Sequence, residues 1–166
     1  MRQCWKEVVI VCKQCKLLND GRAWPPEPQP GLVISYAYLW HHEHRAGREE
    51  GVKDRPCVVI LAVQSAADGT TMVRVAPVTH SPPDNPATAV ELPQAVKRHL
   101  GLDADRSWVV IDEVNEFTWP GFDLRPLPRS RDLYAYGFLP PRLFNALRAK
   151  LAEVWIEGQG KATPRD

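Results

Sequence analysis

Two short segments place residues that suit phosphate binding at the ends of apolar runs. In KDRPCVVIL, Arg55 comes just before a nearly continuous apolar run, and in VRVAPVTH, Thr79 ends another. An arginine held at a fixed backbone position presents a rigid fork of donors to phosphate oxygens. If the two runs pair as adjacent antiparallel strands, Arg55 and Thr79 emerge at the same end and can contact one phosphate. The alternative is that both residues are simply solvated strand ends.

Three further places carry side chains that can transfer protons or stack on bases. Asp112 follows the valine-rich run SWVVI, so it is either a hydrogen-bonded structural carboxylate or a perturbed one that faces a site. His41, His42 and His44 share a polar stretch in which histidines usually face solvent, although imidazole also exchanges protons near neutral pH. Trp119 lies in the loop FTWPGFDLRP, where it either plugs the core or stacks on a nucleic-acid base.

The cysteines do not describe a metal site. Cys12 and Cys15 form a single CxxC pair, whereas tetrahedral zinc needs four ligands, usually from two such pairs or from one pair and two histidines. Nothing in the sequence sets Cys4 or the histidines in register with this pair. We therefore expect free thiols, no metal and no cofactor.

Composition limits the kind of protein this can be. The chain has 166 residues, of which 44% are hydrophobic, enough for one domain with a core. No apolar run approaches the length of a membrane span, and the run from Val8 to Val11 is too short for a secretory signal, so we expect a cytoplasmic protein without membrane contact. The region from Gly31 to Leu139 holds 11 Lys and Arg against 14 Asp and Glu, which counts against general electrostatic binding of nucleic acid.

The chain divides into an extension, a domain and a tail. Four of the six residues from Pro25 to Pro30 are prolines, a composition typical of an extended linker. We therefore predict a poorly ordered or proline-rich extension over residues 1–29, a barrel domain with a C-terminal helix over 30–158, and a tail over 159–166.

The pattern after Pro30 is that of a small β protein with two helices. Pro93 and Gly101 bound a short internal helix over 93–100, and apolar residues at near-helical spacing predict an amphipathic helix over about 141–157. An Asp-Gly turn at residues 68–69 predicts that its flanking strands form a hairpin. These elements predict a mainly β (α+β), compact barrel-like fold, whose expected strands cover residues 32–40, 56–63, 71–79, 87–92 and 107–114.

Taken together, these motifs resemble the MazF/PemK family of toxin endoribonucleases. Gly31 opens the first strand, Arg55-Pro56 precedes the second, and Pro77-Val78-Thr79 ends the third, as the family's motifs do. The likeness covers residues 30–125 and is closest to a divergent, longer subgroup. It implies a small SH3-like β-barrel, a homodimer, a cognate antitoxin as partner, and metal-independent cleavage of single-stranded RNA.

The resemblance also implies roles for individual residues. Arg55 and Thr79 match the family's catalytic arginine and threonine, and Asp112 aligns with an aspartate that some members use as base or binder. His80 stands where the family usually has serine. Val110 occupies the position of a family arginine two residues before that aspartate, which is the main departure from the pattern.

Cleavage by a ribose 2′-hydroxyl needs a base, an acid and fixed positive charge near the phosphorane. Arg55 would supply the charge and Thr79 a hydrogen bond, while Asp112, His80 or His42 would move the protons. DNA should resist, because it has no 2′-hydroxyl. The residues predicted to contact RNA around this centre are His42, Glu43, Lys53, Asn115 and Trp119.

A different class of function stays open. The acidic middle region and Val110 favour a catalytically inactive SH3-like module that binds nucleic acid or a protein partner. RNA cleavage by the purified protein separates this alternative from an endoribonuclease toxin.

Overall fold

A computed structural model describes residues 26–166 of the chain. The predicted extension over residues 1–29 therefore lies almost wholly outside the described residues, and so do Cys4, Cys12 and Cys15. Cys57 is described, and it is a buried free thiol in the centre of the sheet.

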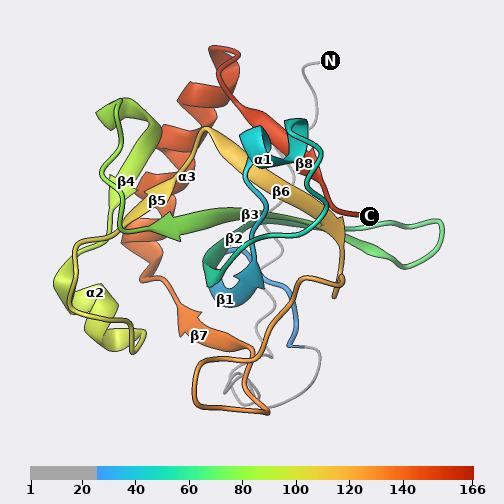
Figure 1. Cartoon of the computed structure of the whole chain (residues 1–166), viewed down its shortest axis with the longest axis horizontal. Helices are drawn as coiled ribbons and strands as arrows, with labels where there is room; N and C mark the ends of the chain where they lie inside the picture. Colours follow the sequence, from blue (N-terminus) through green and yellow to red (C-terminus); the bar gives the residue numbers. More distant parts are fainter. Residues whose placement is uncertain (1–25) are drawn as a thin grey trace.

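Three consecutive strands form the middle of one curled antiparallel sheet (Figure 1). They are β1 (Leu32–Ala37), β2 (Asp54–Gln64) and β3 (Thr71–Thr79). The predicted hairpin is confirmed, because β2 pairs with β3 from Cys57 opposite Pro77 to Gln64 opposite Thr71. Gly69 closes the turn with a φ of 73°, a left-handed conformation that glycine adopts at little cost.

Five further strands complete the sheet around this centre. The strand order is β4-β5-β3-β2-β1-β7. Outside this order, β6 pairs with the first half of β3, and β8 pairs with β6 in parallel. The sheet thus divides at β3, whose last residues pair with β5 and whose first residues pair with β6. These strands are β4 (Ala89–Glu91), β5 (Trp108–Val110), β6 (Glu113–Thr118), β7 (Ala135–Phe138) and β8 (Lys161–Pro164).

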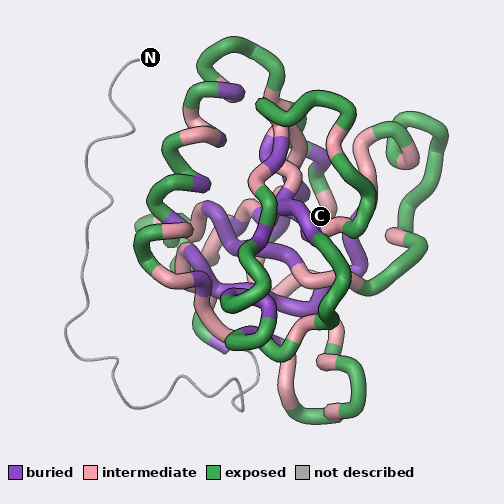
Figure 2. Tube along the Cα trace, turned by 90° about the vertical axis from the view of Figure 1, so that its left-hand side faces the viewer, coloured by how far each residue is buried: buried purple, intermediate pink, exposed green. Residues whose placement is uncertain are grey.

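Both faces of the central strands are buried, which explains their nearly continuous apolar sequences. On one face, α3 (Pro141–Ile156) packs through Phe144, Leu147, Leu151 and Val154, spaced three, four and three residues apart. Figure 2 shows this as a helix buried along one side only. On the other face a second cluster is built around Tyr36, Phe117 and neighbouring side chains. The predicted C-terminal amphipathic helix is confirmed.

Two short helices flank the sheet. The internal helix is confirmed as α2 (Gln94–His99), and Gly101 follows its end with a φ of 68°. The polar stretch after Trp40 forms α1 (His41–Arg45), and a 3-10 turn, η1 (Pro86–Thr88), precedes β4. In residues 26–166 no helix has the length and apolar character of a membrane span. The prediction of a mainly β, barrel-like fold with an internal and a C-terminal helix is confirmed.

Two expectations about the strands need correction. The single strand predicted over 107–114 is divided at Ile111 and Asp112, because the Ile111 N–H bonds to the Thr88 carbonyl and the Ile111 carbonyl accepts a bond from Trp155. Residues 159–166, expected as a tail, include β8, which is held to β6 by the register from Glu113 opposite Lys161 onward.

Candidate active site

A pocket of about 480 Å³ opens at the end of the β2–β3 hairpin that lies away from its turn. Its size is that of an ordinary small-ligand site. Four parts of the chain meet there: residues 53–56 around the start of β2, residues 78–81 at the end of β3, residues 97, 101–103 and 107 from α2 and the loop after it, and Pro128 with Tyr136.

Arg55 lies in this pocket, where β2 begins opposite Tyr36 of β1. Its guanidinium carbon sits 5.0 Å from the centre of the Trp40 ring, a contact that orients the side chain without neutralising its charge. Within residues 26–166 its buried Nε has no hydrogen-bond partner. No ion pair to Arg55 forms within these residues either, so its charge stays available to a ligand in the pocket.

The segment leading to Arg55 depends on Gly51. A Cβ atom at this position would lie 2.5 Å from the Tyr38 carbonyl oxygen, closer than any side chain tolerates. Glycine thus lets the chain return tightly against the end of β1 before it enters β2. This close approach fixes the place from which Lys53 and Arg55 face the pocket.

Thr79 lies across the hairpin in the same pocket, held in place by pairing with Trp108 of β5. Its Oγ1 accepts a 3.2 Å bond from the Ser81 N–H. Because a hydroxyl both accepts and donates, the Thr79 proton stays available for a phosphate oxygen. The structure therefore brings Arg55 and Thr79 together at one end of the hairpin, as expected from antiparallel pairing, and Lys53 and His80 line the same pocket.

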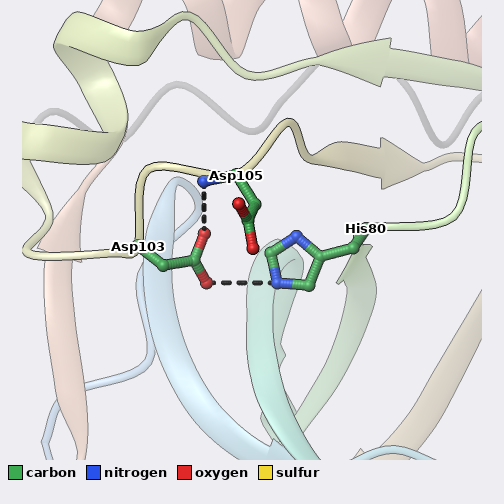
Figure 3. Close-up of side chains that lie close together, drawn as sticks. All are labelled: His80, Asp103 and Asp105. Atoms are coloured by element: carbon green, nitrogen blue, oxygen red, sulfur yellow. Dashed lines mark hydrogen bonds and ion pairs between the residues drawn. The ribbon is translucent and has the colours of Figure 1, made fainter.

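His80 is held at both ring nitrogens. Its Nε2 lies 3.1 Å from Oδ2 of Asp103, and its Nδ1 lies 3.0 Å from the Arg106 carbonyl oxygen and 3.2 Å from Oγ of Ser107. Figure 3 shows the imidazole and the Asp103 carboxylate pointing toward each other. The side chains of His80 and Asp103 are 56% and 54% exposed, so this pair stands at the surface of the pocket.

Behind this pair lies a buried ammonium group. Lys97 is only 1% exposed, and its Nζ donates to Oδ1 of Asp103 at 2.8 Å, to Oγ of Ser107 at 2.7 Å, and to the Asp105 carbonyl. A buried charge is tolerated when it is paired and fully hydrogen-bonded in this way. The bond from Lys97 holds the pKa of the Asp103 carboxyl below its ordinary value, and the charge of His80 acts in the same direction.

The carboxylates here are not arranged for a metal ion. Ligand atoms of His80, Asp103 and Asp105 lie within 4.8 Å of one another. However, Asp103 already contacts the Lys97 ammonium through one oxygen and His80 through the other. Both oxygens of the Asp103 carboxylate are thus already engaged by protein groups.

Asp112, predicted as a catalytic carboxylate, does not line the pocket. It lies in the bend between β5 and β6, and its backbone carbonyl accepts a bond from Lys161. It is half-buried, and burial raises the pKa of its carboxyl. Antiparallel pairing places β5 so that the chain runs from Trp108 away from Thr79, which carries Asp112 away from the hairpin end.

Four of the five predicted RNA contacts also lie outside this pocket. His42 is exposed on α1, whereas Glu43 accepts a bond from the Trp40 N–H and pairs with Arg48. Asn115 is fully buried, and its amide holds the Leu39 backbone through bonds of 3.0 and 2.8 Å, so it presents no surface to RNA.

Trp119 lies at the far end of β3. Its backbone N–H bonds to the carbonyl of Thr71, the first residue of the strand. Thr79 is the last residue of the strand and lies about 26 Å from Thr71 at ordinary strand spacing. The Trp119 ring stacks on Phe117 with centroids 6.1 Å apart. Trp119 therefore closes the second core cluster, as the structural interpretation of this loop expected.

A larger hollow, of about 680 Å³, lies between the α1–β2 connection and the C-terminus. Its inner charges are already paired, since Arg165 donates a 2.8 Å bond to Asp123 and both side chains are 10% or less exposed. The smaller pocket, which both Arg55 and Thr79 line, is the better candidate for chemistry on a phosphate.

A protein-family model described as PemK-like, MazF-like toxin of type II toxin-antitoxin system matches residues 38–155, a span that contains every residue lining the pocket. The search among curated proteins found no match.

Proposed function

Since the chain belongs to the PemK-like, MazF-like toxins of type II toxin-antitoxin systems, we propose that it cleaves single-stranded RNA without a metal ion. The observation that carries this proposal is the pocket in which Arg55 and Thr79 meet. An unneutralised guanidinium beside a free hydroxyl proton is a suitable receptor for one phosphodiester.

In the proposed reaction the ribose 2′-hydroxyl attacks the adjacent phosphorus. Arg55 faces the negative charge that grows on the phosphorane, and Thr79 donates to one of its oxygens. Lys53, exposed at the rim, attracts the phosphate that follows along the strand. Among the residues that line the pocket, His80 has the side chain best suited to proton transfer near neutral pH.

The family implies a cognate antitoxin that holds the toxin inactive. We further propose that the toxin acts in the cytoplasm, where its RNA substrates are, and as a homodimer. Because Lys53 and Arg55 line the pocket, an acidic segment of the antitoxin is suited to occupy it in place of RNA.

The test is cleavage of a single-stranded RNA by the purified full chain with a chelator present. Arg55→Ala should lose cleavage and Thr79→Val should lose most of it, because each removes a group that stabilises the transition state; loss of one such donor typically slows a reaction by about 10²–10³-fold. Arg142→Ala, a change on the exposed side of α3, serves as the matched control and should cleave normally. The corresponding DNA should stay intact.

Two results would overturn the proposal. Cleavage that persists at full rate in both Arg55→Ala and Thr79→Val would place the reaction elsewhere. Binding of RNA or of a protein partner without any cleavage, and without growth arrest on expression, would instead favour the non-catalytic binding module.

A further inference from the structure

We propose that His80 is the proton donor to the departing 5′-oxygen, and that Lys97 and Asp103 are positioning residues that hold its ring in place at the pocket. The inference rests on the proposed function and adds the identity of the general acid. Its basis is a hydrogen-bonded chain that runs from inside the protein to the pocket surface, from Lys97 through Asp103 to His80.

Both nitrogens of the His80 imidazole face groups that accept hydrogen bonds. Nδ1 lies 3.0 Å from the Arg106 backbone carbonyl, which can only accept, so this nitrogen must carry a proton. Nε2 lies 3.1 Å from a carboxylate oxygen of Asp103, which also accepts. A ring that is protonated at both nitrogens satisfies both contacts, and such a ring is an acid rather than a base.

The Asp103 carboxylate is held in place by the buried Lys97. Asp103 is half exposed in a loop, and a free side chain there would sample several rotamers. The buried Lys97 ammonium fixes one of its oxygens at 2.8 Å, which leaves the other directed at His80. Ser107 accepts a bond from the same ammonium and touches the imidazole, so it supports the arrangement from a second side.

The His80 ring is accessible to a bound RNA strand. His80 and Asp103 are both more than half exposed, so an oxygen of a bound strand can replace the carboxylate at Nε2 while Nδ1 stays fixed to Arg106. The charged groups that share this space come from three segments of the chain. They are Lys97 from α2, Asp103 and Asp105 from the loop before β5, and Lys53, Asp54 and Arg55 from the start of β2.

The reaction then balances as follows. The 2′-oxygen forms a bond to phosphorus and its proton passes to water, while the bond from phosphorus to the 5′-oxygen breaks. The bonding electron pair stays on the 5′-oxygen, which takes the proton from Nε2 of His80. The products are a 2′,3′-cyclic phosphate and a 5′-hydroxyl, and the ring regains its proton from water.

A substrate with sulfur in place of the bridging 5′-oxygen tests this assignment, because a thiolate leaves without needing a proton. On the normal oxygen linkage, His80→Gln should slow cleavage by about 10²–10⁴-fold, the usual contribution of a positioned acid. On the sulfur linkage the same variant should cleave close to the wild-type rate. His99→Gln, at an exposed position on α2, is the matched control and should behave as wild type on both.

Asp103→Asn tests the positioning part, because this half-exposed side chain can change without opening the core. It should slow cleavage of the oxygen linkage by less than His80→Gln does. On the sulfur linkage its rate should return close to that of the wild type. Asp84→Asn, in the exposed loop after β3, is its control. Wild-type rates for Asp103→Asn on the oxygen linkage would overturn the positioning role.

The remaining outcomes separate the inference from the proposed function. If the wild type cleaves both linkages but His80→Gln is unimpaired on oxygen, or equally impaired on both, His80 is not the acid although the enzyme assignment stands. If the wild type cleaves neither linkage, the proposed function fails and the inference fails with it. Arg55→Ala should be slow on both linkages, because sulfur does not replace the charge that Arg55 supplies.

Discussion

The buried Lys97 ammonium should stabilise the loop that carries Asp103, and Lys97→Met should measure by how much. Methionine has nearly the same length and fills the same space, so the change removes charge and hydrogen bonds but opens no large cavity. Three acceptors lose their donor: the Asp103 carboxylate, the Ser107 hydroxyl and the Asp105 carbonyl.

The magnitude follows from the exposure of these partners. Removing one member of a buried ion pair costs about 3–5 kcal/mol when the other charge is left unsolvated. Asp103 is 54% exposed and can be hydrated, which lowers the cost to the lesser end, about 2–3 kcal/mol. For a domain of this size, that loss corresponds to a fall in Tm of about 4–12 °C.

The assay is urea unfolding followed by circular dichroism, with thermal unfolding as a second measure. Arg98→Met, the neighbouring exposed position on α2, is the control and should change stability by less than about 0.5 kcal/mol. In a double-mutant cycle, Lys97→Met and Asp103→Asn should be non-additive, since the second change removes a partner already lost. An unfolding midpoint for Lys97→Met equal to that of the wild type, or strict additivity, would refute this account of the ammonium.

Three further predictions address other parts of the molecule. Replacing Arg165 with Met leaves the buried Asp123 carboxylate without its 2.8 Å donor, so the unfolding free energy should fall by about 3–5 kcal/mol in a urea titration; an unchanged midpoint would contradict it. The pKa of Asp103 is depressed in the folded state, so its contribution to stability is present above about pH 4, the ordinary value, and is lost as the pH falls further. The stability difference between wild type and Asp103→Asn should therefore shrink in acid, and a difference that grows there would count against the bond to Lys97. Trp40→Leu removes the ring beneath Arg55, so RNA should bind about 2- to 30-fold more weakly in a fluorescence titration, and unchanged affinity would show that the ring contact does not orient the guanidinium.

The parts of the fold that were predictable depend on local patterns. Asp68 and Gly69 mark a tight turn between two apolar runs, and the buried residues of α3 repeat at helical spacing, so neither needs distant information. The helix α1 was not predictable from local pattern, because one of the bonds at its first turn is distant: the His41 N–H donates to Glu113, 72 residues along the chain. Strand β8 likewise exists only through its parallel pairing with β6.

The site shows the same division. Arg55 and Thr79 could be brought together from strand pairing alone, since antiparallel neighbours align their opposite ends. Lys97 and Asp103 could not, because the only trace of their role is a lysine between Val96 and Leu100 on α2, and such lysines usually extend into solvent. Asn115 was predicted to contact RNA because it is a polar residue beside an acidic motif. In the structure its side chain instead bonds to the buried backbone of Leu39, which no local pattern indicates.

The most direct test of the central claim, that the hairpin-end pocket cuts RNA, is the mass spectrum of RNA fragments made by the full chain in the presence of a chelator. We predict fragments that end in a 2′,3′-cyclic phosphate and begin with a 5′-hydroxyl, made by the wild type and by Arg142→Ala but not by Arg55→Ala. The same fragments from Arg55→Ala at the wild-type rate would contradict the claim.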